Sequence, residues 1–372
     1  MTEFTNYFIP VNNTKNKPFS EGSFGERFAF NNEFNNEIQV ALISISETRN
    51  SYTGKYNTNT NLIRSYLYKL TNIDKINITD LGELKSGNSV KDTYASVKDV
   101  TNYLLQKNII PVFFGGSQDL TIPLLRGFNN LHNEIELTVV DAKIDAIDNE
   151  FHSQSYLNQI NNEFNNVFIS VLGYQSYFVP KQIIATAEKN SWDLYRLGLI
   201  RNNFKQIEPI LRDSDIVSFD LSSVRQSDNP GAVFQSPNGL YAEEACQLAN
   251  LSGISDKIKV FSFFEYNHDN DIQKNSAHLS AQIIWYFLFG ISQREKDYPI
   301  KNLNAYKKIF VKIEKTDSEL IFYKNPINNR FWVEIPVKKG ETKIISCSEN
   351  DYIKACNNEI SDRIWKNISR NF

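Results

Sequence analysis

The chain has 372 residues, of which 41% are hydrophobic and 13% aromatic, enough for one large core or two ordinary ones. A net charge of only −3 argues against a protein that binds nucleic acid through phosphate contacts. Cys246, Cys347 and Cys356 are too few and too scattered for a disulfide framework or a zinc site. With no basic and apolar leader and no apolar stretch of about 18 residues, we expect a cytoplasmic protein outside the membrane.

Strands and helices are predicted to alternate after a polar, irregular first segment. Residues 1–36 are expected to form an arm on the surface, and residues 37–300 the main domain. Apolar runs predict strands at residues 39–45, 76–84, 109–114, 135–140, 167–172, 215–221 and 257–264. Helical spacing predicts helices at residues 62–70, 90–107, 154–160, 181–189, 203–212, 241–251 and 276–291, with another beginning near residues 118–121.

This alternation predicts a three-layer α/β fold, in which helices cover both faces of a mostly parallel sheet. From about residue 304 the pattern changes to short alternating segments separated by turn residues. These segments are residues 308–313, 319–323 and 331–336, followed by a helix that contains Ile360, Ile364 and Trp365. We therefore expect residues 301–372 to form a small antiparallel meander and a C-terminal helix, appended to the main domain.

Polar residues follow four of the predicted strands at the point where each strand should end. In an open parallel sheet, ligands bind outside the carboxyl ends of the strands. A single acidic residue there often only caps a turn, but four such ends in one chain indicate a shared site. The residues concerned are Gln118, Asp141, Lys143, Asp145, Asp220, Ser222 and Glu265.

The order of these segments resembles the arginase, agmatinase and formimidoylglutamase family, which has the ureohydrolase fold. The resemblance extends over roughly residues 38–292. Within the family, the chain is most similar to the formimidoylglutamase branch, including proteins of Bacteroidetes. The resemblance rests on Gly115-Gly116, Asp141-Ala142-Lys143-Ile144-Asp145, Ser218-Phe219-Asp220, Glu265, and residues 118–121, 225–228 and 236–239.

In active members of the family, six side chains hold two Mn²⁺ ions, and a glutamate orients the substrate. The resemblance implies that three of the six acidic or imidazole ligands are retained and three are replaced. The retained positions are Asp141, Asp145 and Asp220, with Glu265 at the substrate-orienting position. The replaced positions are Gln118 and Lys143, where the family has His, and Ser222, where it has Asp.

Lys143 is the residue on which this interpretation depends. An ammonium has no lone pair for a metal ion, and acidic side chains at close range repel one another without metals. We expect Lys143 to form a salt bridge with Asp141 or Asp220 and to fill the space of the metals. No metal cofactor is therefore expected, although Mn is implied for active relatives. A single ion would use Asp141, Asp145, Asp220 and Gln118, an oxygen-only set suited to Mg²⁺ or Ca²⁺.

Two functional hypotheses remain open. The first is a catalytically inactive binding, regulatory or scaffold protein that takes a small amino-acid-like ligand or a protein partner. The second is a hydrolase of linear amidine C–N bonds, of the formimidoylglutamase type, with an altered or single-metal site. In that case Asp145 would act as the acid/base group and Glu265 would orient the substrate. We favour the first, because the family reaction requires a metal-activated water and three of the six implied metal ligands are replaced in this chain. The resemblance also implies an oligomer, while no nucleic acid or membrane partner is expected.

Other candidate residues have structural interpretations. His268 is expected in a solvated loop, and His278 and Cys246 are expected to pack on helices of the core. Arg225 and Asp228 follow the Asp220 segment. They could contact an anionic ligand or pair with each other, and the sequence does not separate the two.

Overall fold

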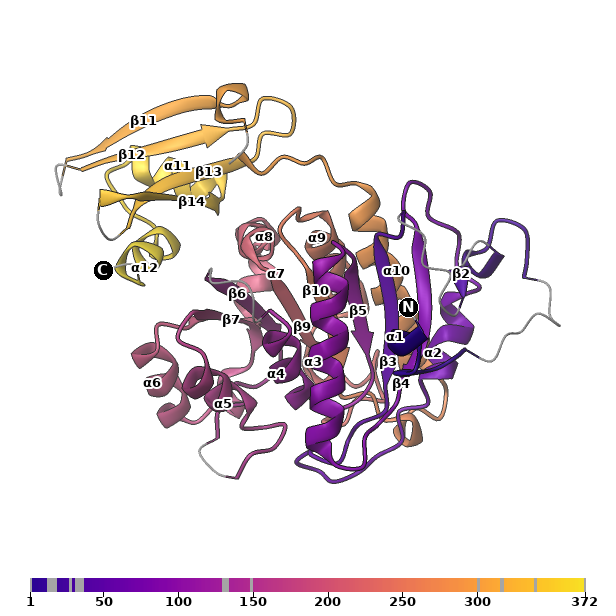
Figure 1. The fold of residues 1–372 in the computed structure, drawn as a ribbon. Coiled ribbons are helices and arrows are strands. Elements are labelled where there is room, and N and C mark those ends of the chain that lie inside the picture. Colours follow the sequence, from indigo (N-terminus) through magenta and orange to yellow (C-terminus); the bar gives the residue numbers. More distant parts are fainter. Residues whose placement is uncertain are drawn as a thin grey trace.

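A mostly parallel sheet runs through the larger part of the molecule (Figure 1). The computed structural model describes residues 2–11, 19–26, 29–30, 37–128, 134–147, 150–299, 302–314, 318–337 and 340–370. The strands of this sheet are β1 (Phe8–Ile9), β2 (Ala29–Phe30), β3 (Val40–Ile45), β4 (Ile78–Leu84), β5 (Ile110–Phe114), β6 (Ile135–Val140), β7 (Val167–Tyr174), β8 (Asp193–Arg196), β9 (Ile216–Asp220) and β10 (Val260–Phe264). Their order is β1-β4-β3-β5-β10-β9-β6-β7-β8, with β2 also on β4, and only β1 runs antiparallel to its neighbour.

Helices cover both faces of the sheet, so the predicted three-layer α/β fold is confirmed (Figure 1). One face carries α2 (Thr60–Leu67), α7 (Leu197–Asn202), α8 (Phe204–Asp213), α9 (Ala242–Ile254) and α10 (Asn275–Ser292). The other face carries α1 (Thr2–Thr5), α3 (Val90–Gln106), α4 (Thr121–Arg126), α5 (Tyr156–Glu163) and α6 (Lys181–Lys189). In the described part of the chain, no helix is long and apolar enough to cross a membrane.

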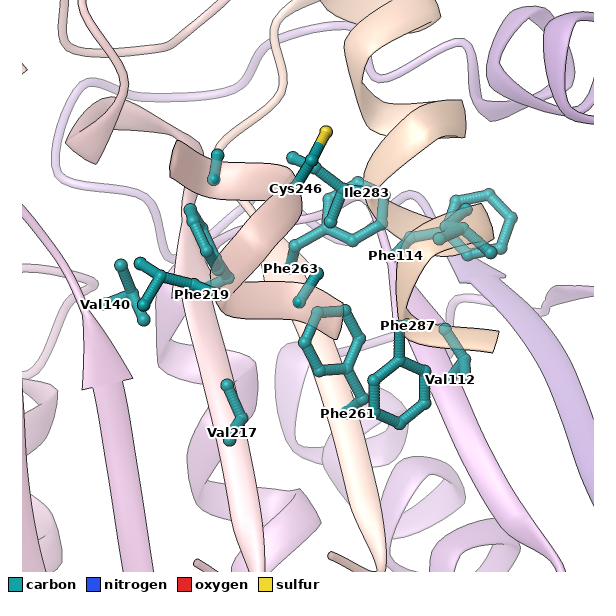
Figure 2. Packing of buried hydrophobic residues seen from close by; sticks show 14 of the residues in the cluster. Val112, Phe114, Val140, Val217, Phe219, Cys246, Phe261, Phe263, Ile283 and Phe287 are labelled. Carbon is teal, nitrogen blue, oxygen red and sulfur yellow. The ribbon is translucent and has the colours of Figure 1, made fainter. Parts of the chain in front are cut away.

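The central strands bury both of their faces, as continuous apolar runs require. Along β10, Phe261 and Phe263 face the core beneath α9 and α10, whereas Phe264 faces the opposite core. Figure 2 shows Phe261 stacked on Phe287 of α10, with ring centroids 4.2 Å apart. Burying an aromatic side chain of this size stabilises the fold by about 1.5–3 kcal/mol. The strand ends that carry polar residues are therefore fixed by a rigid core.

Local signals explain where α3 begins and how it packs. Ser89 accepts a hydrogen bond from the backbone N–H of Asp92, and the Asp92 carboxylate accepts one from the backbone N–H of Ser89. This capping box satisfies N–H groups that the first turn of a helix leaves without partners. Val97, Val100 and Leu104 then recur at helical spacing and are buried against the sheet.

The end of the chain forms a separate four-stranded antiparallel sheet, which confirms the prediction of a small antiparallel extension. Its strands, in spatial order, are β11 (Lys307–Ile313), β12 (Ser318–Lys324), β13 (Phe331–Pro336) and β14 (Thr342–Cys347), followed by α11 (Glu349–Cys356) and α12 (Asp362–Arg370). Sequence patterns missed β14 and α11, which are short and carry few periodic apolar residues. Ile360 precedes α12 rather than lying within it. The predicted domain boundary at residues 300–301 lies outside the described residues.

Buried polar contacts join this extension to the main domain. The Arg212 guanidinium donates to the carbonyl oxygens of Phe331 and Cys347, each at 3.0 Å. Asp213 accepts from the backbone N–H of Ser346 at 3.0 Å and pairs with Arg363 of α12. The last turn of α8 thus holds β13, β14 and α12 in place.

The predicted surface arm differs most from the structure. Phe4 and Phe8 are buried in the core beneath α3, and β1 pairs with the edge strand β4. The apolar run at residues 7–9 is too short to establish strand alternation, so the sequence did not reveal this strand. Residues 12–18 and 31–36 of the predicted arm lie outside the described residues. The sequence also missed β8 and α7, which are too short to establish a period.

Candidate functional site

Four neighbouring strands, β5, β10, β9 and β6, end at the same edge of the sheet. Gly115 and Gly116 turn the chain after β5 with φ of 83° and 80°. A Cβ at Gly115 would lie 2.7 Å from the carbonyl oxygen of Ile45, so this turn requires glycine. The turn places Gln118 beside Glu265, because the backbone N–H of Glu265 donates to the carbonyl of Gly116 at 2.9 Å.

Three aspartates form the centre of the site. At least one carboxylate oxygen of Asp141, Asp145 and Asp220 lies within 4.8 Å of those of the other two. Their side chains are only 1%, 5% and 4% exposed, respectively. Asp141 Oδ1 accepts from the backbone N–H of Lys143 at 2.9 Å, and Asp220 Oδ1 accepts from that of Ser222 at 2.6 Å. Asp141 Oδ2 receives no hydrogen bond from any N–H or hydroxyl group in the described part of the chain.

Burial raises the pKa values of these three carboxyl groups, and repulsion between neighbouring carboxylates raises those of Asp141 and Asp145 further. Burial raises the pKa of Asp141 well above its ordinary value, and the charges of Asp145 and Asp220 raise it further. Burial raises the pKa of Asp145 to about 7, with the Asp220 charge as the second cause. The pKa of Asp220 is raised to about 6 by burial, although hydrogen bonds from Ser222 oppose the shift. A cation placed among them would relieve this strain.

Lys143 does not form the expected salt bridge. Among the described residues, its ammonium has no carboxylate oxygen within 4.0 Å. It lies instead over the ring of Phe234, 3.5 Å from the centroid, and its charge lowers the pKa of Asp141, Asp145 and Asp220 from a distance. The expected salt bridge is therefore wrong, because the ammonium lies on an aromatic face that the sequence did not reveal. The expectation that Lys143 fills the space of the metals stays a prediction.

Glu265 is held in place by its neighbours. Its φ of 64° lies in the left-handed region, which is rare for a side chain of this kind and often marks functional sites. Oε1 accepts from the backbone N–H of Gln118 at 2.8 Å, and Oε2 accepts from the Tyr56 hydroxyl at 3.1 Å. Burial, followed by the charge of Asp220, raises the pKa of Glu265 well above its ordinary value.

Gln118 lies entirely below the surface, behind Glu265. Its Nε2 donates to the Ser218 hydroxyl at 2.9 Å and to the Tyr156 hydroxyl at 3.4 Å. Its Oε1 accepts from no donor in the part of the chain that the structure describes. Because buried polar atoms normally have partners, this amide oxygen and Asp141 Oδ2 are both candidate ligands of a cation.

The aspartates open into a cleft of about 280 Å³. Two aromatic side chains line it: Phe234 packs edge-on against Phe178 with centroids 5.1 Å apart, and Tyr52 lies against His152 at 4.9 Å. The lining residues are Ser51, Tyr52, Thr53, Asp141, Lys143, Asp145, Ser153, Gln154, Asp220, Ser222, Val233, Phe234 and Glu265. Sequence reasoning found the acidic floor but missed Tyr52, Tyr56 and Phe234, which lie in irregular segments without a strand-end signal.

The residues set aside by sequence have structural roles. The Arg225 guanidinium pairs with Asp228 at 2.9 Å, and Asp228 also accepts from the backbone N–H of Ala242 at the start of α9. His278 stacks on Tyr66, with centroids 4.8 Å apart. Cys246 is buried, and burial raises the pKa of its thiol to about 12.

Comparison with known proteins identifies the family of this fold. The family model described as Arginase family matches residues 52–290. The chain belongs to the arginase family. A formimidoylglutamase from Bacillus subtilis (strain 168) is 20% identical over 244 residues, which are 62% of this chain and 74% of that protein.

Solved structures of arginase-family proteins share the fold. The B. subtilis formimidoylglutamase structure has a TM-score of 0.69 at 16% identity and covers 77% of this chain and 97% of its own. Trypanosoma cruzi formiminoglutamase, solved with Mn²⁺, has a TM-score of 0.68 at 16% identity, with coverage of 74% and 100%. Agmatine ureohydrolase of Thermoplasma volcanium has a TM-score of 0.60 at 20% identity, with coverage of 75% and 96%. At these identities the likeness concerns the fold.

The donor set fits one metal ion of a particular kind. Among the described residues, Asp141, Asp145 and Asp220 are the one group of three or more acidic, imidazole or thiol side chains close enough to bind an ion together. Gln118, expected from the sequence as a fourth ligand, is not among the residues that line the cleft, so the donors that line it are carboxylate oxygens. Oxygen-only sets suit Mg²⁺ or Ca²⁺ better than they suit metals that prefer imidazole.

Proposed function

We propose that this arginase-family protein binds a small, positively charged, amino-acid-like ligand in the cleft and does not hydrolyse it through a two-metal centre. The observation that carries the proposal is the position of Lys143. It stands between Asp141 and Asp145 in the sequence, and its ammonium lies over the ring of Phe234. This position supplies a fixed positive charge where an active relative would need a metal ligand.

The chemistry of the donor set supports the absence of a second metal. The family reaction needs a water that two metal ions activate together. By resemblance, the three further ligand positions carry the amide of Gln118, the ammonium of Lys143 and the hydroxyl of Ser222. The ammonium cannot donate a lone pair, and an amide and a hydroxyl are weak ligands for Mn²⁺. A single ion held by the three aspartates would supply positive charge that orients an anionic or carbonyl group of a ligand.

The charges in the cleft support a cationic ligand. Asp141, Asp145, Asp220 and Glu265 are buried acids, and Lys143 is the one basic side chain lining the described cleft. Buried charges that lack partners are unfavourable, so a cation that neutralises them binds favourably. The aromatic walls add attraction for organic cations, and a cleft of about 280 Å³ admits a small molecule.

A ligand screen tests the binding half of the proposal. Agmatine, arginine and formimidoylglutamate should raise the melting temperature of the protein, whereas citrulline, which lacks the side-chain charge, should not. Asp220→Asn should abolish the shift, and Asp99→Asn, at an exposed position on α3, should retain it. Equal shifts with citrulline and arginine would contradict a charge-selected ligand.

An activity assay tests the other half. We expect no hydrolysis of formimidoylglutamate, arginine or agmatine with added Mn²⁺. The combined variant Gln118→His, Lys143→His, Ser222→Asp should gain Mn²⁺ binding, because it restores the family ligands. Lys143→Arg should gain none, because it preserves the charge. Clear turnover by the unaltered protein would contradict the proposal.

The second candidate is hydrolysis of a linear amidine with one metal ion or none. The pKa of Asp145, raised to about 7 by burial, favours it, since a group that titrates near neutrality suits proton transfer. Asp145 would then carry the proton, and Glu265 would orient the cationic group of the substrate. Turnover that Asp145→Asn abolishes would establish this alternative.

A further inference from the structure

The seat of the Lys143 ammonium is assembled from separate parts of the fold. Phe234 lies in the segment between β9 and α9, and the backbone N–H of its neighbour Val233 donates to the carbonyl of Glu265 at 3.0 Å. Phe178, in the segment after β7, supports the ring edge-on. The seat is therefore fixed by the same strand ends that hold the acidic floor.

This seat keeps the ammonium out of contact with the aspartates. Main-chain and side-chain atoms of Lys143 act in different ways: its N–H is bound to Asp141 Oδ1, whereas its ammonium lies 3.5 Å from the centre of the Phe234 ring. Two buried oxygen atoms, Asp141 Oδ2 and Gln118 Oε1, meanwhile accept from no described donor. Asp141 Oδ2 thus remains available to a cation in a cleft that the Lys143 side chain also lines.

We infer that Lys143 is the residue that sets the cation preference of this cleft, with Phe234 as the seat that positions its charge. Coulomb repulsion grows with the product of the charges, so one ammonium repels a divalent ion about twice as strongly as a monovalent one. Lys143 therefore weakens the binding of divalent metal ions more than it weakens the binding of monovalent organic cations. The inference rests on the proposed function, because it concerns the same cleft and specifies what that cleft admits.

A comparison of Lys143→Met with Lys143→Arg tests the role of the charge. Mn²⁺ binding to the metal-free protein is followed by electron paramagnetic resonance of the free ion, and guanidinium binding by calorimetry. Lys143→Met should tighten Mn²⁺ binding at least tenfold and guanidinium binding by a smaller factor. Lys143→Arg retains the charge and should change neither by more than about threefold. Unchanged Mn²⁺ affinity in Lys143→Met, or a larger gain for guanidinium, would overturn the inference.

The role of the seat is tested by a double-mutant cycle with Phe234→Leu. Without the aromatic face, the ammonium can contact the aspartates directly, so Phe234→Leu should weaken Mn²⁺ binding when Lys143 is present. In the Lys143→Met background, the same substitution should leave Mn²⁺ affinity unchanged. Equal effects in both backgrounds would show that Phe234 does not act through Lys143. Circular dichroism confirms folding of each variant, and Lys143→Gln provides a second uncharged substitution.

These measurements separate this inference from the proposed function. Turnover by the unaltered protein would refute the proposed function and leave the Lys143 comparison to be judged by its own binding data. Conversely, if the protein is inactive and Lys143→Met does not change its Mn²⁺ affinity, the proposed function stands and this inference is refuted.

Discussion

Two groups of buried acidic side chains lie in the same sheet, and their surroundings differ. Asp80 of β4 accepts four hydrogen bonds: from Nε and Nη2 of Arg64, from the Tyr68 hydroxyl and from the backbone N–H of Gly82, at 2.7–3.0 Å. Each of its oxygens has two donors. The aspartates of the cleft have, by contrast, only backbone and hydroxyl donors nearby and one ammonium that does not touch them.

This difference separates a structural acid from a functional one. A buried carboxylate that is matched by a guanidinium contributes to the fold and has nothing to offer a ligand. Carboxylates that face one another without a counter-ion lower the stability of the fold. Such clusters of acidic side chains are typical of sites that bind a ligand. Removing one charge at a time from each group tests whether the two kinds of acid differ in this way.

The largest effect is expected at the paired acid. Arg64→Met leaves Asp80 buried without its partner, and the free energy of unfolding should fall by about 3–5 kcal/mol. Urea denaturation measures the change. The matched control is Arg126→Met, which breaks the exposed pair with Glu163 and should cost less than about 1 kcal/mol. Similar losses for the two variants would contradict the view that burial makes the Asp80 pair structural.

The junction with the extension should behave like the Asp80 pair. Asp213→Ala removes the acceptor for Ser346 and the partner of Arg363, and should lower the free energy of unfolding by about 3 kcal/mol. Arg363→Ala should cost a similar amount, and the double variant should cost less than the sum, because both belong to one network. Additive losses in urea denaturation would show that the two residues act independently.

Removing an acidic side chain from the cleft should raise the free energy of unfolding, whereas removing a charge from the paired groups lowers it. In the unfolded chain Asp145 ionises near pH 4, whereas burial raises its folded pKa to about 7. Stability is therefore lost as the pH rises from about 4 to 7, because the unfolded state releases the proton first. With a chelator present, Asp145→Asn should raise the free energy of unfolding by up to about 4 kcal/mol at pH 8, which corresponds to the shift in pKa, and leave it unchanged at pH 4. A loss of stability at pH 8 would contradict the account of uncompensated acids.

The strand ends that carry the site could be predicted from sequence because continuous apolar runs stop at Asp141, Asp220 and Glu265. The spatial order of the strands that brings them together was not predicted, since apolar periodicity does not determine which strands are neighbours. The position of the Lys143 ammonium could not be predicted. It depends on Phe234, which is distant in sequence and lies in a segment without periodic pattern.

The same limit explains the other differences. The buried residue Phe4 stands alone and Phe8 lies in an apolar run of only three residues, so the pairing of β1 with β4 gave no periodic signal. Tyr56 reaches Glu265 from an irregular loop, and only the folded chain reveals that contact. Sequence reasoning thus recovers the elements with long patterns and misses single side chains that act through tertiary contacts.

The number of Mn²⁺ ions bound per chain shows whether the cleft can form a two-metal centre. Equilibrium dialysis of the purified, unaltered protein against Mn²⁺, followed by elemental analysis, measures it beside the triple variant Gln118→His, Lys143→His, Ser222→Asp. We predict no more than one ion per chain in the unaltered protein and a second ion only in the variant. Two stoichiometric ions in the unaltered protein would contradict the proposal that it lacks a two-metal centre.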